Sequence, residues 1–399
     1  MILAMVAAVL PFDAHNHIHL GPIPSPPLPS STWTTAARRS STTHKCAEGT
    51  PPPQQRLRHY VRHALPEVVS GLALMATHPR DFQPLLDLHR EILDTRYTSN
   101  HHNTADGSDP GTSFHVLPCL GVHPWFLHEL EPEDWELIPA PSFSSSSSIH
   151  PLQLEPNEIP KWVAQLEEYL HRNPQVPCVG EIGLDQFHFN PTTNELTTTM
   201  AQQKLAFRYQ LQLATMYNRA VSVHCVQAVG SLMEVLHEVS THNLQIQQQY
   251  DEYEENEDEP PPPHSRVLPP RIYFHAFGGK AATAIQLIRT LEKIKPNKKK
   301  RRPGRQQPKP PRPTTKVYFG FAPIVNFQTK TQAKTLDVIR TIGIQRLVLE
   351  TDHDDVTELQ ASLDQGVDLI AAALQMAPED VIRRTNRNVR ELYNLTTAL

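Results

Sequence analysis

Short, nearly continuous apolar segments recur eight times along the chain, and most precede a segment with helical periodicity. Continuous apolar runs are typical of parallel strands buried on both faces, since the intervening helices cover the sheet on each side. We expect strands at 6–13, 68–77, 115–123, 176–185, 220–225, 271–277, 316–321 and 346–352. Eight strand–helix units predict an α/β protein with a (β/α)8 barrel of the TIM type.

Helical patterns fill most of the gaps between these segments. We expect helices at 81–94, 159–171, 194–217, 230–240, 280–294, 329–341, 363–376 and 378–393. The last of them begins with Pro378, Glu379 and Asp380. Proline is favoured at the first helical position, and acids in the first turn complement the helix dipole, so this helix start is well marked.

Low-complexity segments interrupt the pattern. They lie at about 21–55, 99–112, 140–158, 245–270 and 295–315, and they are rich in proline, serine, glutamine or charged residues. Such segments have too few apolar side chains to pack a core. Without them roughly 280 residues remain, close to one barrel of about 250. The sequence therefore predicts a single barrel domain over residues 1–399, with disordered insertions inside it.

The charge distribution is uneven. Eleven of the 37 Lys and Arg residues fall within 293–316, which has no acid, and the rest of the chain has 26 basic against 42 acidic residues. An acidic body with one basic segment is not typical of a general nucleic-acid binder. The run at 298–302 is consistent with a nuclear-import signal, with a contact to DNA, or with a solvated loop.

Features that indicate location point to the cell interior. The four cysteines form no CxxC pair, which fits a reducing compartment. The apolar first ten residues lack a basic region before them, so we expect no signal peptide. The chain has no apolar run of about 18 residues, so we expect no membrane span. We therefore expect a cytoplasmic or nuclear protein that is not secreted.

Metal-binding side chains stand at the ends of six expected strands. They are His15 and His17, His123, Glu181, His224, His275 and Asp352. The carboxyl ends of barrel strands open onto one face, which is where active sites of this fold lie. Taken singly, each histidine is as readily explained as a hydrogen-bonded core or loop residue, so only the whole set indicates a metal site.

The residue types suit a divalent metal. His15 and His17 are two residues apart, so on an extended strand their side chains point to the same side. Neutral imidazoles and carboxylates together suit ions such as zinc or manganese. A carboxylate between two ions can bridge them, and two ions about 3.5–4 Å apart can hold both reacting oxygens of a phosphodiester.

The segments that hold these residues resemble, in order, the TatD-related metal-dependent hydrolases. They read FDAHNHIH, GVHPW, VGEIGLD, VHCV, FHAFGG and LVLETD. This family has an amidohydrolase-type barrel and deoxyribonuclease activity, and the resemblance covers nearly the whole chain outside the insertions. The segments CLGVHPWFLHEL and ETDHDD are more similar to a fungal branch, whose members are described as interacting with a component of a cell-cycle ubiquitin ligase.

Carried over position by position, the resemblance implies a site with two divalent ions, which would be Zn, Mn or Mg. It implies metal ligands at His15, His17, Glu181, His224, His275 and Asp352. Glu181 and Asp352 would also be catalytic, with Asp352 orienting the nucleophilic water or taking its proton. His123 would bind the substrate through the scissile phosphate or support the ligands.

The chain departs from the family pattern next to these residues. His19 stands where the family usually has an acid, and Gln186-Phe187 where it has a polar residue and arginine. His353-Asp354-Asp355 replace a small residue and proline. The ligand candidates are all retained, so these changes bear on the contacts to substrate.

From these observations we expect a metal-dependent hydrolase of phosphodiester bonds, in particular a deoxyribonuclease, with DNA or another phosphodiester as its substrate. Two alternatives stay open. The same barrel can hydrolyse a different ester or an amide, because a fold does not fix a substrate. The chain can also be a scaffold that keeps a metal for structure while its insertions bind a protein partner.

Overall fold

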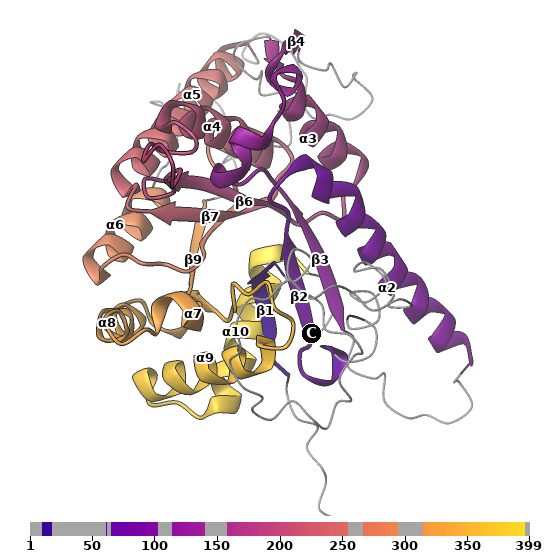
Figure 1. Ribbon diagram of the computed structural model, residues 1–399, viewed down its shortest axis with the longest axis vertical. Coiled ribbons are helices and arrows are strands. Elements are labelled where there is room, and N and C mark those ends of the chain that lie inside the picture. The colour runs from indigo at the N-terminus through magenta and orange to yellow at the C-terminus, as the bar shows by residue number, and fades with distance from the viewer. Residues whose placement is uncertain are drawn as a thin grey trace, which may run out of the picture.

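The computed structural model describes residues 10–17, 61, 65–102, 114–139, 158–253, 266–293 and 314–395. Eight parallel strands form one sheet, in which each strand pairs with the next (Figure 1). They are β1 (Phe12–Asn16), β2 (Gly71–Met75), β3 (His115–Leu120), β6 (Cys178–Asp185), β7 (Ala220–Val226), β8 (Arg271–Phe274), β9 (Lys316–Gly320) and β10 (Leu347–Val348). Each predicted strand has its counterpart, so the predicted (β/α)8 barrel is confirmed.

Backbone hydrogen bonds close the sheet between its first and last strands. The amide of Ala14 donates to the carbonyl of Leu349 at 2.9 Å, and that of Asp352 donates to the carbonyl of His15 at 3.0 Å. The segment after β10 thus continues the pairing that the two-residue strand begins. The closed sheet places the ends of β1 and β10 side by side.

The buried side chain of Asp13 supports this closure. Its carboxylate accepts both the amide of Thr351, at 3.0 Å, and the Thr351 hydroxyl, at 2.6 Å. The carbonyl of Ala14 accepts the hydroxyl of Tyr393, at 2.7 Å. Side chains therefore complete the hydrogen bonding where the backbone ladder is irregular.

Helices surround the strands. They are α2 (Phe82–His102), α3 (Lys161–Arg172), α4 (Met200–Met216), α5 (Val229–Tyr253), α6 (Ala281–Leu291), α7 (Pro323–Asn326), α8 (Gln332–Ile342), α9 (Leu359–Leu374) and α10 (Pro378–Tyr393). In the view of Figure 1, α4, α5, α6, α8 and α9 lie to the left of the strands, and α2 and α3 lie to the right. Their apolar faces pack on the outward-facing strand residues, as buried parallel strands require.

Shorter elements complete the described segments. Five are 3-10 helices, namely η2 (Leu65–Glu67), η3 (Pro79–Asp81), η4 (Pro124–Glu129), η5 (Pro132–Trp135) and η7 (Ile344–Arg346). Strands β4 (Leu137–Pro139) and β5 (Glu158–Pro160) form a separate antiparallel pair. Of these elements, η4 matters for the site, because it begins directly after His123.

Several predicted boundaries are wrong. Strand β1 runs to Asn16 rather than stopping at 13, because its pairing with the segment after β10 continues past Asp13, so His15 lies within the strand. Helix α4 begins at Met200 instead of 194, where the Thr199 side chain caps the Gln202 amide. Helix α10 has the predicted bounds.

Two helices extend into segments that we expected to be low-complexity. Helix α2 continues to His102, and α5 continues to Tyr253. Glutamine is a good helix former and extending a helix costs little, so the glutamine-rich start of 245–270 continues α5.

The other predicted insertions lie wholly or mainly outside the described residues. This holds for 21–55, for 103–112, 140–157 and 254–265, and for 295–313, which contains the basic run 298–302. The single domain over 1–399 stays a prediction. Among the described segments, no helix is long and apolar enough to cross a membrane.

A glycine allows β6 and β7 to pair beside the site. The φ angle of Gly183 is 149°, and a Cβ atom there would lie 1.9 Å from the carbonyl oxygen of His224. The register between the two strands shifts between Val179 and Ile182, just before this contact. Only a residue without a side chain fits, since any Cβ would push the two strands apart.

We therefore expect Gly183→Ala to destabilise the fold by on the order of 2–4 kcal/mol, because backbone atoms and not a flexible side chain occupy the space. Gly230→Ala in α5 is the matched control, since nothing lies within 4 Å of a Cβ there. The control should change the free energy of unfolding by less than about 1 kcal/mol. Urea unfolding measures both, and equal values would contradict the argument.

Candidate metal centre

Glu181, near the middle of β6, is the centre of the candidate site. Its Oε2 atom lies 3.2 Å from Nε2 of His15 and 2.8 Å from Nε2 of His17. Its Oε1 atom faces three other rings, with 3.1 Å to Nε2 of His123, 2.9 Å to Nδ1 of His224 and 2.6 Å to Nε2 of His275. One buried carboxylate therefore separates two groups of histidines, one on each oxygen.

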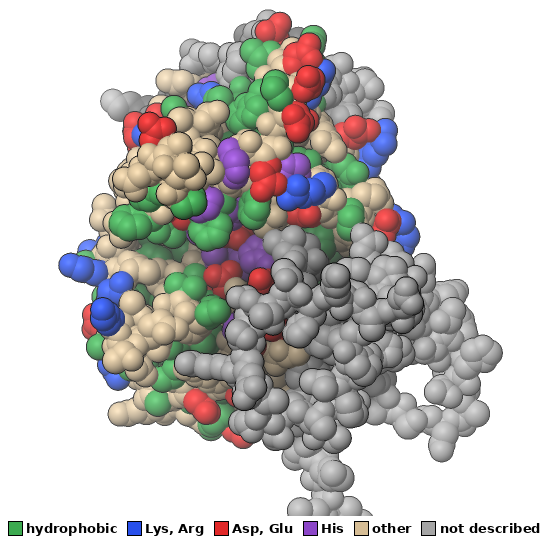
Figure 2. Space-filling model, viewed as in Figure 1, with side chains coloured by type: hydrophobic (Ala, Val, Ile, Leu, Met, Phe, Trp, Pro, Cys, Tyr) green, Lys and Arg blue, Asp and Glu red, His purple; other side chains and the backbone are tan. Residues whose placement is uncertain are grey.

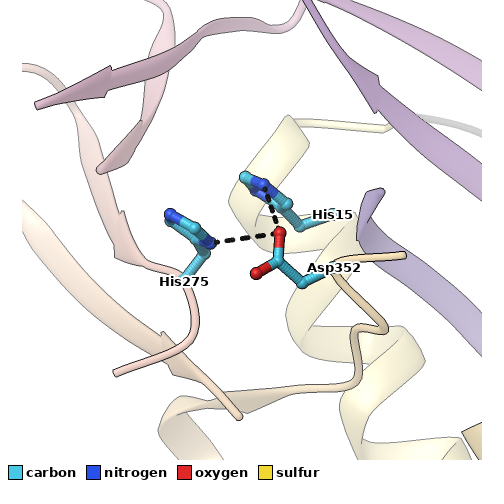
Figure 3. A group of neighbouring side chains, drawn as sticks. All are labelled: His15, His275 and Asp352. Atoms are coloured by element: carbon cyan, nitrogen blue, oxygen red, sulfur yellow. Dashed lines mark ion pairs between the residues drawn. The ribbon is translucent and has the colours of Figure 1, made fainter. Parts of the chain in front are cut away.

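Asp352 joins the cluster from the segment after β10. Its Oδ1 atom lies 3.5 Å from Nε2 of His15 and 3.9 Å from Nδ1 of His275 (Figure 3). A φ angle of 56° turns the chain at Asp352, a conformation that aspartate tolerates better than most residues. Its side chain is 18% exposed against 2% for Glu181. Asp352 is thus the carboxylate within reach of solvent.

Hydrogen bonds outside the cluster orient the histidine rings. Nδ1 of His15 lies 2.9 Å from the Ser222 hydroxyl, and Nδ1 of His17 lies 3.2 Å from the carbonyl oxygen of Met75. In a neutral imidazole, a nitrogen that donates to such an oxygen leaves the other nitrogen with its lone pair. Both rings can then direct Nε2 into the cluster as a metal ligand.

Asp185 orients His224 in the same way. Its Oδ2 atom lies 2.9 Å from Nε2 of His224, and it also accepts the Trp125 indole N–H at 2.7 Å. These bonds and a third from the amide of Phe187 hold the pKa of Asp185 at about 2, although burial alone would raise it. The ionised carboxylate makes His224 a more basic ligand at Nδ1.

The buried groups shift one another's pKa values. Burial lowers the pKa of His123 to about 4 and that of His15 well below its usual 6.5. Burial also disfavours a charged His224, but the hydrogen bonds from Asp185 and Glu181 more than offset it and raise the pKa to about 9. Nearby histidines keep the pKa of Glu181 well below 4.5 against the effect of burial.

The donor set fits divalent metal ions. The donor atoms form three groups, and within each group all of them lie within 4.8 Å of one another. The groups are His15, His17 and Glu181; His123, Glu181 and His224; and His15, His275 and Asp352. The buried Nδ1 atom of His275 makes no hydrogen bond to the described residues, and the Oδ1 atom of Asp352 lies 3.9 Å from it. A buried polar atom without a partner is costly, and a cation would remove that cost.

The spacing of the donors supports the same interpretation. Ligand atoms bound at about 2.0–2.2 Å to one ion lie about 3 Å from each other. The distances from Glu181 to the surrounding nitrogens fall in this range. We conclude that these residues fit a divalent metal.

The structure brings all seven predicted site residues together. They are His15, His17, His123, Glu181, His224, His275 and Asp352. Their individual roles as ligands, catalysts or substrate contacts stay predictions. His19 lies outside the described residues. His123 points Nε2 at Glu181, so it is also placed to be a ligand.

Sequence reasoning missed the residues that support the ligands. Asp185 lies four residues after Glu181 in β6, and Ser222 lies two residues before His224 in β7. Residues an even number of positions apart on a strand share a face, so each of them lies on the same face as a ligand candidate. This even spacing from a ligand candidate is the sequence pattern that could have identified them. Asp13 has the same relation to His15, and it bonds to Thr351.

Comparison with known proteins agrees with this geometry. The family model described as TatD related DNase matches residues 12–394. The chain belongs to this family. It is therefore related to hydrolases over nearly its whole length, and the resemblance found in the motifs is confirmed.

Individual TatD relatives are distant. The Cut9-interacting protein scn1 of Schizosaccharomyces pombe is 23% identical over 316 residues, covering 70% of this chain and 84% of that protein. The human 3'-5' RNA nuclease TATDN2 is 22% identical over 183 residues, covering 45% of this chain and 16% of that protein. The yeast match agrees with the expected fungal branch.

A solved TatD structure shares the fold. A hydrolase TatD family protein from Entamoeba histolytica aligns with a TM-score of 0.51 and 12% identity, covering 97% of this chain and 98% of that one. This likeness supports the barrel.

We expect Asp185→Asn to weaken metal binding by about 10–100-fold, the usual effect of removing a carboxylate behind a ligating histidine. Asparagine keeps the shape but removes the charge that His224 faces. Titration with Zn²⁺ or Mn²⁺ against a competing chelator measures this. Asp337→Asn, an exposed acid on α8, is the control. Unchanged affinity in Asp185→Asn would show that His224 needs no such support.

Metal binding should also release protons. With its pKa raised to about 9, His224 is mostly protonated at neutral pH in the metal-free protein, and a ligand must be neutral. Metal affinity should therefore rise with pH until about 9. Calorimetry in buffers of different ionisation enthalpy should give buffer-dependent heats, and His224→Gln should reduce that dependence. Identical heats in all buffers would contradict this prediction.

Proposed function

We propose that this protein is a metal-dependent hydrolase of phosphodiester bonds in nucleic acid, and in particular a deoxyribonuclease. The observation that carries the proposal is the position of Glu181, whose two oxygens face separate groups of histidines. This is the arrangement that a carboxylate shared by two ions requires, and two-ion sites are typical of phosphodiester hydrolysis.

The proposed metal ligands are His15, His17, Glu181, His224, His275 and Asp352. His15 and His17 would hold one ion, and His224 and His275 the other, with Glu181 between them. When bound, Zn²⁺, Mn²⁺ or Mg²⁺ ions supply a water of lowered pKa and stabilise the charge on the phosphoryl oxygens. The proposed ligands form a largely buried cluster, in which Asp352 and His17 are the most exposed side chains.

Asp352 is proposed as the residue that orients the attacking water and accepts its proton. It is the more exposed carboxylate of the cluster, so a water on the open side can reach it. Burial raises its pKa above the usual 3.8, which brings it closer to the range in which a carboxylate acts as a base. We propose that His123 contacts the phosphate of the substrate.

The relatives support nucleic acid as the substrate class. The human relative is named as a 3'-5' RNA nuclease, so RNA belongs beside DNA in any test. The yeast relative is named for its interaction with Cut9. We therefore also propose that this protein binds a protein partner, through segments outside the described residues.

We expect Glu181→Gln and Asp352→Asn each to lower the rate of DNA hydrolysis by about 100-fold or more, because the first removes the carboxylate shared by the proposed ions and the second removes the proposed base. The assay presents single-stranded DNA, duplex DNA and RNA with Zn²⁺, Mn²⁺ or Mg²⁺ in turn. Product release from labelled substrates measures the rate.

Matched controls separate catalysis from folding. Glu234→Gln on α5 removes an exposed acid that pairs with Lys204, and Asp337→Asn removes one on α8. Both should keep wild-type rates, and all four variants should keep the far-UV spectrum. If the wild-type protein hydrolyses no nucleic acid with any of these metals, the proposed function is wrong.

A further inference from the structure

Exposed aromatic side chains stand beside the candidate metal centre. Trp125 is 37% exposed, Phe187 59% and Phe189 43%. Trp125 belongs to η4 after β3, and the two phenylalanines lie in the loop after β6. An aromatic side chain can bury 150–250 Å² when packed, so several left in contact with water indicate a binding surface.

Two ring contacts hold these aromatic side chains in place. The His188 ring stacks on Trp125, with 4.6 Å between centroids and 16° between planes. Phe187 and Phe189 form an edge-to-face pair at 5.9 Å. We call Trp125, Phe187, His188 and Phe189 the aromatic ledge. Histidine and acidic side chains gather near the middle of one face of the molecule, with hydrophobic side chains next to them (Figure 2).

Asp185 fixes the aromatic ledge to the metal ligands. Its Oδ1 atom accepts the amide of Phe187 at 2.5 Å, while Oδ2 accepts both the Trp125 indole and His224. The Trp125 ring lies 5.1 Å from that of His123 and 5.7 Å from that of His224. A group resting on the aromatic ledge would therefore be adjacent to the cluster.

The exposed ring faces of the aromatic ledge favour a ligand that binds by stacking. The indole N–H of Trp125 is already bonded to Asp185, so the exposed ring surface offers stacking and no donor that reads a base edge. Stacking on aromatic rings accepts any nucleobase, since each base has a π-face. Bases within a duplex are covered on both faces by their neighbours, so only unpaired bases can use such a surface.

Resting on the proposed function, we propose that the aromatic ledge is a subsite that stacks the unpaired bases of a single-stranded nucleic acid whose phosphate lies at the metal-ligand cluster. Single strands are then bound through base faces as well as phosphates, and without strong sequence preference. Duplexes must fray at an end to bind in the same way.

The test measures binding and not cleavage. In the Glu181→Gln protein, fluorescence anisotropy follows a labelled oligothymidylate and an oligonucleotide of the same length with abasic sites. Adding Phe187→Ala and Phe189→Ala should weaken oligothymidylate binding by about tenfold, the effect of losing a base stack. The abasic oligonucleotide should bind both proteins alike, because it has no base to lose.

Leu93→Ala, another exposed apolar residue, lies on the outer helix α2 and should leave both affinities unchanged. If the double substitution weakens both oligonucleotides equally or neither, the aromatic ledge does not stack bases, whatever the wild-type protein cleaves. In the Phe187→Ala, Phe189→Ala protein with Glu181 restored, KM for single strands should rise about tenfold with little change in kcat. Failure of the wild-type protein to bind or cleave any nucleic acid would overturn both proposals.

Discussion

The hydrogen bonds between Asp13 and Thr351 are the interaction on which the rest of the site depends. Strand β10 has two residues, so its backbone ladder alone is short. The Asp13 carboxylate binds the segment that follows it and thereby holds the ends of the first and last strands together. His15 and Asp352 lie directly beyond these bonds, and their side chains meet at 3.5 Å.

A second buried acid, Glu350, supports the backbone next to His275. Glu350 accepts the amide of Ala276 at 2.7 Å and the hydroxyl of Tyr273. The chain turns at Ala276, with a φ angle of 39°, directly after His275. Gly320 leaves the space that Glu350 occupies, because a Cβ there would lie 2.5 Å from the carboxylate. The backbone directly after His275 is thus held by an acid that is not itself one of the candidate ligands.

The sequence predicted the barrel and the seven clustered residues because both follow from local patterns. Continuous apolar runs mark buried strands, and residues at strand ends in a barrel must converge. What it did not predict depends on contacts between distant segments. Strand β1 extends through His15 because it pairs with the segment after β10. Asp185 and Ser222 support the site through hydrogen bonds to histidine rings on other strands, those of His224 and His15.

Two helix boundaries were also predicted wrongly. Helix α4 begins at a capping box formed by Thr199 and Gln202, a local signal that the apolar pattern does not contain, and α5 continues through residues whose composition resembles a linker. Apolar periodicity ends before the helix does, so an amphipathic pattern finds the packed part of a helix and misses a solvated extension. The exposure of Phe187 and Phe189 after β6 likewise depends on how distant segments pack, which a local pattern does not show.

Closure by the first and last strands has a consequence for biosynthesis. The contacts of Asp13 with Thr351 and of Ala14 with Tyr393 span 338 and 379 residues. His15 and Asp352 are likewise 337 positions apart (352 − 15), so a growing chain contains His15 long before it contains Asp352. A chain that still lacks the segment after β10 therefore leaves an edge of β1 unpaired and the candidate ligand cluster without one of its carboxylates, so the cluster is completed only when the barrel closes.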